Sequence, residues 1–191
     1  MTGPLVQLTG GAERRQAPPS GEARPRIAEA APPAVVLLRR ARLADVPVLY
    51  ELLDAYARQG LLLPRTAEQI AHRIREFTVA VDAHGVAGCG ALRLYTPELG
   101  EVVALAVADR LQGQGIGRSI VESIVDEAQE RGVRRLFALT LRERFFNQLG
   151  FVTRPMAEMP EKLAADCASC PRRQACNEIL VLRELPLAHC N

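Results

Sequence analysis

The stretch LAVADRLQGQGIGRSIVESI, residues 105–124, decides the fold of this chain. It reads as the end of an apolar strand, a short loop, and a helix that begins among glycines. The apolar positions of this helix recur at helical spacing: Ile116, Ile120, Ile124 and Ala128. Three glycines precede or open the helix, at Gly113, Gly115 and Gly117. They let backbone N–H groups converge without obstruction from Cβ atoms.

The start of this helix has the chemistry of an anion site. Unpaired N–H groups and the positive end of the helix dipole meet near Ile116, where a pyrophosphate would fit. The spacing excludes two common alternatives. No Gly-Lys-Ser/Thr closes a Walker P-loop, and the glycines do not follow the G-x-G-x-x-G pattern of nicotinamide sites.

The segments around this stretch predict a mixed α/β fold with most of the core in the sheet. The expected strands cover residues 35–40, 77–82, 86–95, 101–107, 134–140 and 179–185. The expected helices cover about 44–58, 66–76, 116–131 and 142–150. Thr66 and Gln69 form a capping-box pattern that opens the second helix, and Gly132 ends the third.

Composition limits the classes of function. The chain has 191 residues, 48% of them hydrophobic, and a net charge of +2, so a broad basic field for nucleic acid is absent. Residues 1–34 are rich in Pro, Ala and Arg and are expected to be a disordered tail, followed by one domain over 35–191. With no long apolar run and no secretory h-region, we expect a cytoplasmic protein without membrane contact.

The pattern Gln112-x-x-Gly115-x-Gly117 after a strand resembles the acetyl-CoA loop of the GNAT acetyltransferase superfamily. The resemblance implies a central, mostly antiparallel sheet with splayed strands flanked by helices, and acetyl-CoA as co-substrate. In that superfamily the strand before the loop offers free backbone groups to the pantetheine arm. The implied cofactor-binding residues are Leu105, Val107, Gln112, Gly113, Gln114, Gly115, Ile116, Gly117 and Arg118.

Further segments resemble the short, single-domain N-acetylglutamate synthases. They are GLLLPRT (60–66), GEVVALAV (100–107), LFALT (136–140), FFNQLGF (145–151) and the tail MPEKLAADCASCPRRQACNE (159–178). The first and last are the specific ones, and the others occur in many GNAT enzymes. The resemblance implies acetylation of the α-amino group of glutamate, with glutamine still open, as the first step of arginine biosynthesis.

Amine acetylation needs a neutral nitrogen, and an α-amino group is mostly protonated at pH 7. The resemblance places the catalytic glutamate at Glu101. Many GNAT enzymes protonate the leaving thiolate with a tyrosine just before the Gly-Phe pair, but Phe146 stands there. Thr140 can position a water or donate its hydroxyl in that role, or it can simply satisfy the end of a strand.

A dianionic substrate such as glutamate calls for cations. Arg65 lies in a loop before a helix, a position suited to carboxylate capture. Lys162 is expected in the loop after Phe151, where it would take the second carboxylate.

The cysteine tail leaves two readings open. Cys167, Cys170 and Cys176 have spacing that can supply three zinc thiolates, with Cys190 or His189 as a fourth ligand. Otherwise they are reduced thiols in a segment that packs over the substrate site.

Two other functions remain open at this point. One is a GNAT enzyme for another amine or a protein N-terminus, and the other is a non-catalytic acetyl-CoA-binding module, which Phe146 favours and Glu101 opposes. The expected partner is a small-molecule amino acid, with a homodimer as an open oligomeric state.

Overall fold

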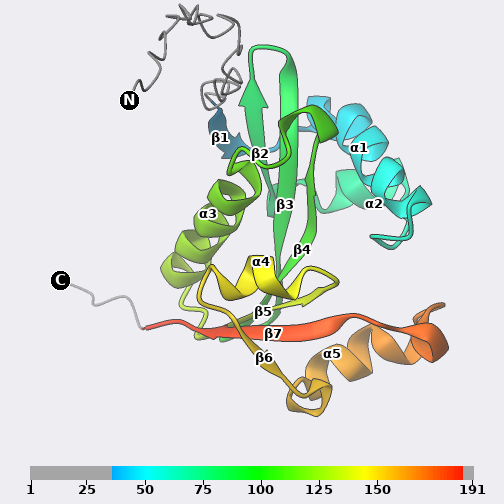
Figure 1. The fold of residues 1–191 in the computed structure, drawn as a ribbon, viewed down its shortest axis with the longest axis vertical. Helices are drawn as coiled ribbons and strands as arrows, with labels where there is room; N and C mark the ends of the chain where they lie inside the picture. Colours follow the sequence, from blue (N-terminus) through cyan, green and yellow to red (C-terminus); the bar gives the residue numbers. More distant parts are fainter. Residues whose placement is uncertain (1–35, 187–191) are drawn as a thin grey trace, which may run out of the picture. The chain divides into compact units, whose positions relative to one another are not determined.

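The computed structural model describes residues 36–186, which form one seven-stranded sheet covered by helices on both faces (Figure 1). The order of strands in the sheet is β1-β2-β3-β4-β5-β7-β6. Their bounds are β1 Leu37–Arg40, β2 Phe77–Asp82, β3 Gly85–Thr96, β4 Leu99–Val107, β5 Arg135–Thr140, β6 Val152–Arg154 and β7 Ile179–Glu184. All neighbours are antiparallel except β4 and β5, which run parallel.

The helices divide between the two faces of the sheet. They are α1 Val46–Arg58, α2 Ala67–His72, α3 Ile116–Glu130, α4 Glu143–Asn147 and α5 Pro160–Ala165. One core cluster joins the apolar stripe of α3 and Phe146 of α4 to β5. A second cluster joins α1 and α2 to the opposite face of β2, β3 and β4. Figure 1 shows α3 on one side of the sheet and α1 with α2 on the other.

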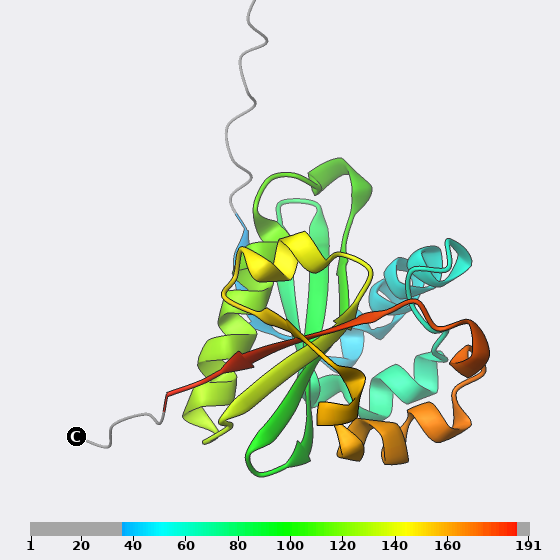
Figure 2. The same ribbon diagram turned by 60° about the horizontal axis from the view of Figure 1, so that its bottom comes forward.

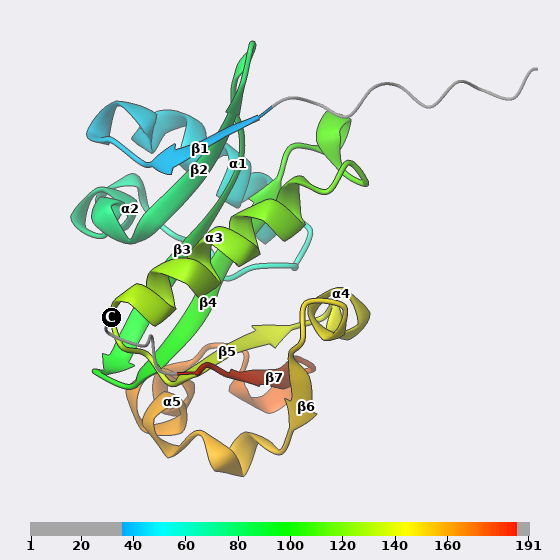
Figure 3. The ribbon, with the colours of Figure 1, turned by 90° about the vertical axis from the view of Figure 1, so that its left-hand side faces the viewer.

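The parallel pair β4–β5 is short, and this opens the sheet. Register pairs join only Leu99, Gly100 and Glu101 of β4 to Arg135, Leu136 and Phe137 of β5. Beyond Glu101 the two strands diverge (Figure 3). The remainder of β4, from Val102 to Val107, therefore has β3 on one edge and no strand on the other.

A β-bulge adjusts β4 just before this free edge ends. Between the pairs Cys89↔Ala106 and Ala91↔Val103, β4 advances three residues while β3 advances two. Ala104 takes up the extra residue with a φ of 55°, in the left-handed region that alanine rarely adopts. The bulge shifts the alternation of the strand and sets which backbone groups face the opening.

The expected elements are confirmed, and the main differences concern short segments. The capping box forms, with Gln69 N–H donating to Thr66 Oγ1 at 3.2 Å, but α2 ends at His72 and a 3-10 turn completes the segment to Glu76. The structure adds β6 and α5, so Lys162 lies on a helix rather than in a loop. The expected tail, residues 1–34, lies outside the described residues.

No helix within residues 36–186 has the length and apolarity that crossing a membrane requires.

Candidate active site

The glycine-rich loop leads into the N-terminus of α3. Gly113 and Gly115 have φ angles of +77° and +83°, and a Cβ at either would find no atom within 4 Å. The first turn of α3 holds no acidic side chain and no side-chain cap. Its N–H groups are thus open to a ligand, and the helix dipole favours an anion there. The geometry fits the pyrophosphate predicted for this loop.

The free edge of β4 lies beside this loop. Ala108 N–H donates to Ala87 O at 2.8 Å, toward β3, so the N–H of Val107 points to the other edge. There it donates to the Tyr56 hydroxyl at 3.2 Å, and that hydroxyl donates to Val107 O at 2.7 Å. Leu105, two residues earlier in β4, has no register partner in β3 or in β5. Tyr56 therefore occupies backbone groups that the sequence assigns to the pantetheine arm.

Gln112 ties the loop to this edge. Its Nε2 donates to the Tyr56 hydroxyl at 3.1 Å and to Asp109 Oδ1 at 2.8 Å. On the other side of the loop, Arg118 is exposed and pairs with Glu122 at 3.1 Å. Gln114 and Ile116 complete the turn, the latter buried in the core beneath α3. The predicted cofactor residues are thus brought together along one continuous path from Leu105 to Arg118.

Glu101 sits where β4 and β5 part. It pairs with Arg93 of β3 and with Phe137 of β5 and is 3% exposed. Because side chains directly opposite or two apart share a face, Arg93 and Tyr95 project to the same side as Glu101. A carboxylate at this depth requires partners.

Those partners form a polar cluster of Arg93, Tyr95, Glu101, Lys162 and Asp166. Lys162 Nζ lies 2.9 Å from Glu101 Oε2 and 2.9 Å from Asp166 Oδ2. The Tyr95 hydroxyl lies 2.7 Å from Glu101 Oε2, and Arg93 Nη1 lies 2.6 Å from Asp166 Oδ2. The cluster joins β3 and β4 to α5 and holds two cations against two carboxylates.

Members of the cluster shift one another's pKa values. Burial raises the pKa of the Tyr95 phenol, and the charge of Glu101 raises it further, so the phenol stays protonated. Burial acts to raise the pKa of Asp166, but hydrogen bonds from Tyr95, Lys162 and Arg93 outweigh it and lower that pKa to about 2. Burial alone would lower the pKa of Lys162, yet Glu101 and Asp166 hold it above its usual value. The ionised states of Asp166 and Lys162 are therefore stabilised by their neighbours in the cluster.

Arg65 approaches the same site from the loop before α2. It is half-buried, and its guanidinium forms no ion pair or hydrogen bond with any group of residues 36–186. Burial lowers the pKa of Arg65, and the charges of Arg73 and Arg93 lower it further. With Leu63, Pro64, Gln69 and Arg73, it lines a hollow of about 270 Å³.

Thr140 ends β5 at the same end of the sheet. It is 8% exposed, pairs with Ile179 of β7, and its Oγ1 accepts a hydrogen bond from Arg142 N–H at 2.8 Å. The hydroxyl proton remains available to donate. Phe146 lies in the core, with edge-to-face contacts to Phe145 and Phe151 at ring-centroid distances of 5.1 and 5.2 Å.

The cysteine segment gives no support to the zinc reading. Within residues 36–186, no three His, Cys, Asp or Glu side chains gather as a metal site would require. Cys167, Cys170 and Cys176 are free thiols. Cys167 begins a 3-10 turn after α5, Cys170 follows that turn, and Cys176 follows the next one. His189 and Cys190, the proposed fourth ligands, lie outside the described residues. The segment contacts the loop between α1 and α2, where Arg172 Nη2 donates to Gly60 O at 2.8 Å.

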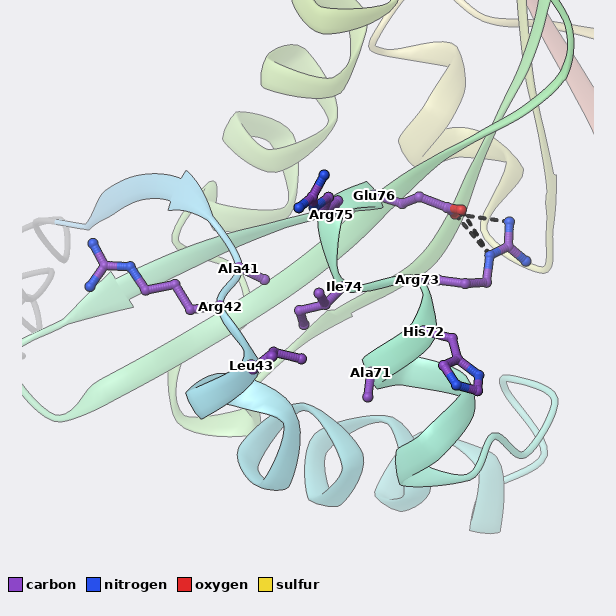
Figure 4. A pocket seen from close by; sticks show the side chains of 9 residues that line it. All are labelled: Ala41, Arg42, Leu43, Ala71, His72, Arg73, Ile74, Arg75 and Glu76. Atoms are coloured by element: carbon purple, nitrogen blue, oxygen red, sulfur yellow. Dashed lines mark hydrogen bonds and ion pairs between the residues drawn. The ribbon is translucent and has the colours of Figure 1, made fainter.

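A second hollow, of about 500 Å³, lies between the end of β1 and the end of α2 (Figure 4). Arg73 borders both hollows, and in Figure 4 it faces Glu76, with which it forms an ion pair of 2.8 Å. The other polar residues that line this second hollow are Arg42, His72 and Arg75. Their side chains are exposed and do not converge on one point. Its lining includes none of the predicted catalytic residues.

Sequence reasoning missed several polar residues of the site: Tyr56, Arg93, Tyr95, Asp166 and Glu178. Glu178 precedes β7, and burial raises its pKa, with Lys162 and Glu101 close enough to act on it. A usable signal existed for α5, since Pro160 at its first turn followed by Glu161 is typical of a helix start. That helix would have placed Lys162 and Asp166 on one face, four residues apart.

Known proteins resemble this chain in sequence and in fold. The family model described as Acetyltransferase (GNAT) family matches residues 46–151. An uncharacterized N-acetyltransferase of Chlorobaculum tepidum is 38% identical over 81% of this chain and 99% of its own length. An amino-acid acetyltransferase of Mycobacterium tuberculosis is also 38% identical, over 60% of this chain and 67% of its own length.

Solved structures agree. A structure of N-acetylglutamate synthase from Neisseria gonorrhoeae with coenzyme A and N-acetyl-glutamate has a TM-score of 0.70 and 30% identity, covering 80% of this chain. This chain spans only 36% of that synthase. A Mycobacterium tuberculosis protein in complex with CoA has a TM-score of 0.69 and 29% identity, covering 78% of this chain and 99% of that one. The splayed sheet, the glycine-rich loop and these matches agree, and the chain belongs to the GNAT family of acetyltransferases.

Proposed function

We propose that this GNAT enzyme transfers the acetyl group of acetyl-CoA to the α-amino group of L-glutamate, with glutamine as the nearest alternative acceptor. This reaction is the first step of arginine biosynthesis. Relatives named amino-acid acetyltransferase support an amino acid as acceptor. The synthase structure with N-acetyl-glutamate supports glutamate in particular.

Arg65 is the observation that carries the proposal. A half-buried guanidinium that is surrounded by Arg73 and Arg93, with no anion bound to it among residues 36–186, is electrostatically incomplete. A planar carboxylate completes it, because the guanidinium fork can donate two parallel hydrogen bonds. The charge of Glu101 acts on the pKa of Arg65, which supports a pose with the carboxylate of the acceptor at Arg65 and its amine at Glu101.

The remaining residues supply the chemistry of acetyl transfer. The loop from Gln112 to Gly117 holds the pyrophosphate. The backbone N–H of Leu105, and that of Val107 once the Tyr56 hydroxyl gives it up, stabilise the oxyanion that forms when the amine attacks. Glu101 takes the proton of the ammonium, directly or through water. Thr140 places its hydroxyl proton near the departing thiolate, in the place of the tyrosine that Phe146 replaces.

The test is an assay of thiol release from acetyl-CoA across the common amino acids, followed by Arg65→Ala. We expect glutamate or glutamine to be the preferred acceptor, and Arg65→Ala to raise its KM at least about tenfold, equivalent to roughly 1.4 kcal/mol. Acetyl-CoA affinity should stay within about twofold, because the cofactor loop is separate. Arg65→Lys should restore activity only in part, since it returns the charge without the fork.

Arg134→Ala is the matched control, because Arg134 is an exposed arginine for which no ion pair is seen within residues 36–186. It should change neither constant. Preference for a neutral amino acid or a polyamine would refute the glutamate proposal and leave the acetyltransferase family unaffected. Tight coenzyme A binding with no thiol release toward any amine would point to a non-catalytic module.

A further inference from the structure

Lys162 has no donor left for a substrate. An ammonium group has three N–H donors, and those of Lys162 face Glu101 Oε2, Asp166 Oδ2 and the Tyr95 hydroxyl at 2.9, 2.9 and 3.2 Å. The residue is 9% exposed and is the only lysine of the chain. The sequence predicted that Lys162 would take the second carboxylate of glutamate, but this geometry favours a different role.

The two carboxylate oxygens of Glu101 are not equivalent. Oε2 accepts a hydrogen bond from Lys162 and lies 2.7 Å from the Tyr95 hydroxyl, whose one proton it shares with Asp166. No group of residues 36–186 donates to Oε1. In that same part of the chain, the enclosed side-chain oxygens without a partner belong to Glu127 and Glu161. Oε1 of Glu101 is therefore not sealed into the protein. One oxygen is clamped, and the other is free to meet a substrate or a water.

We propose that Lys162 is a positioning residue, which with Tyr95 and Asp166 fixes Glu101 through Oε2 and balances its charge, so that Oε1 alone receives the proton of the acceptor ammonium. This rests on the proposed function in one respect, the role of Glu101 as the base. In the step, an N–H bond of the ammonium breaks and an O–H bond forms at Oε1, directly or through one water. The freed nitrogen lone pair then attacks the thioester carbonyl.

Lys162 is the cation that pairs directly with Glu101 within residues 36–186. Asp166, directly after α5, shares Lys162 with Glu101. Arg93 and Tyr95 face Glu101 from β3, Arg65 approaches from the loop before α2, and Glu178 precedes β7. Arg93 is already paired with Asp166. Without Lys162, Glu101 would keep two carboxylates nearby and lose its nearest cation. A buried carboxylate in that setting ionises only at higher pH.

The test measures kcat/KM against pH for wild type, Lys162→Met, Lys162→Gln and Lys162→Arg, with the best acceptor amino acid. In Lys162→Met and Lys162→Gln, the acidic half-maximum of activity should move up by about one pH unit or more, since a neighbouring opposite charge is worth that much. Acceptor KM should change less than about threefold. Lys162→Arg should return the half-maximum to near the wild-type pH. The glutamine variant keeps a hydrogen-bond donor for Oε2 and so guards against misfolding of the methionine variant.

Glu101→Gln supplies the second arm. If Lys162 acts through Glu101, adding Lys162→Met to Glu101→Gln should change the pH profile no further. A rise of tenfold or more in acceptor KM with an unmoved pH profile would instead make Lys162 a substrate cation and overturn the inference. The pH profile can be measured with any amino acid that the enzyme accepts. Failure of the glutamate proposal would appear in the acceptor preference and would leave the test of Lys162 unaffected.

Discussion

At the scale of single residues, the site depends on how each charge is partnered. Glu101, Lys162 and Asp166 satisfy one another inside the protein, whereas Arg65 is left without an anion among residues 36–186. A satisfied charge stabilises the structure or tunes a neighbour, and an unsatisfied one is available to a ligand. This contrast supports the proposed roles, with the first group in the machinery and Arg65 at the substrate.

Asp166→Asn tests the strength of this cluster through acid stability. The folded pKa of Asp166, about 2, is below its ordinary value of 3.8. Its ionised form therefore stabilises the fold above about pH 4, and this contribution disappears as pH falls toward 2. We expect Asp166→Asn to lower the free energy of unfolding at pH 7 by about 1–2 kcal/mol, with the difference from wild type vanishing near pH 2. Urea titrations across this pH range measure it.

The control for that experiment is Asp126→Asn, which changes an exposed carboxylate on α3. It should stay within about 0.5 kcal/mol of wild type at every pH. A pH-independent loss in Asp166→Asn would mean that the side chain matters for its shape or hydrogen bonds and not for its charge.

At the scale of elements, the loop and the strand before it were readable from the sequence, because local patterns specify them. Glycine spacing marks the start of α3, and alternation marks β2 and β3. The cluster around Glu101 was not readable, since Tyr95 and Asp166 lie 71 residues apart and meet only through the register of β3 and the packing of α5. β6 was missed because three exposed residues carry no periodicity.

Gly115→Asp tests the loop as an element. The carboxylate would stand at the anion site and repel the pyrophosphate, so coenzyme A binding should become undetectable by calorimetry while the protein stays folded. Gly132→Asp is the matched control. The φ angle of Gly132 is +79°, close to the +83° of Gly115, and a Cβ at Gly132 would also find no atom within 4 Å. Gly132 lies at the far end of α3, so that variant should lose similar stability and keep coenzyme A. Equal binding by both variants would remove the loop from the cofactor site.

At the scale of the described domain, the sheet has a closed end and an open one. Three register pairs hold β4 to β5, and the Glu101–Lys162 and Arg172–Gly60 contacts add links at the acceptor side. The rest of β4 has no neighbouring strand on that edge, and a tyrosine hydroxyl occupies the backbone of Val107. A cofactor lying along this edge would supply the missing hydrogen bonds and bring the two parts of the sheet into contact through itself.

Coenzyme A should therefore stabilise the whole domain and protect this edge in particular. At a ligand concentration 100 times Kd, the free energy of unfolding should rise by about 2.7 kcal/mol, or roughly 5–10 °C in Tm for a protein of this size. In hydrogen exchange by mass spectrometry, peptides covering residues 102–107 should slow at least about tenfold, because their free N–H groups gain a partner. Peptides from β2, which is paired on both edges, serve as the internal reference and should not change beyond the global effect. Protection confined to residues 112–118, with 102–107 unaffected, would show that the splayed edge does not hold the pantetheine arm, and the roles proposed for Leu105 and Val107 would have to be withdrawn.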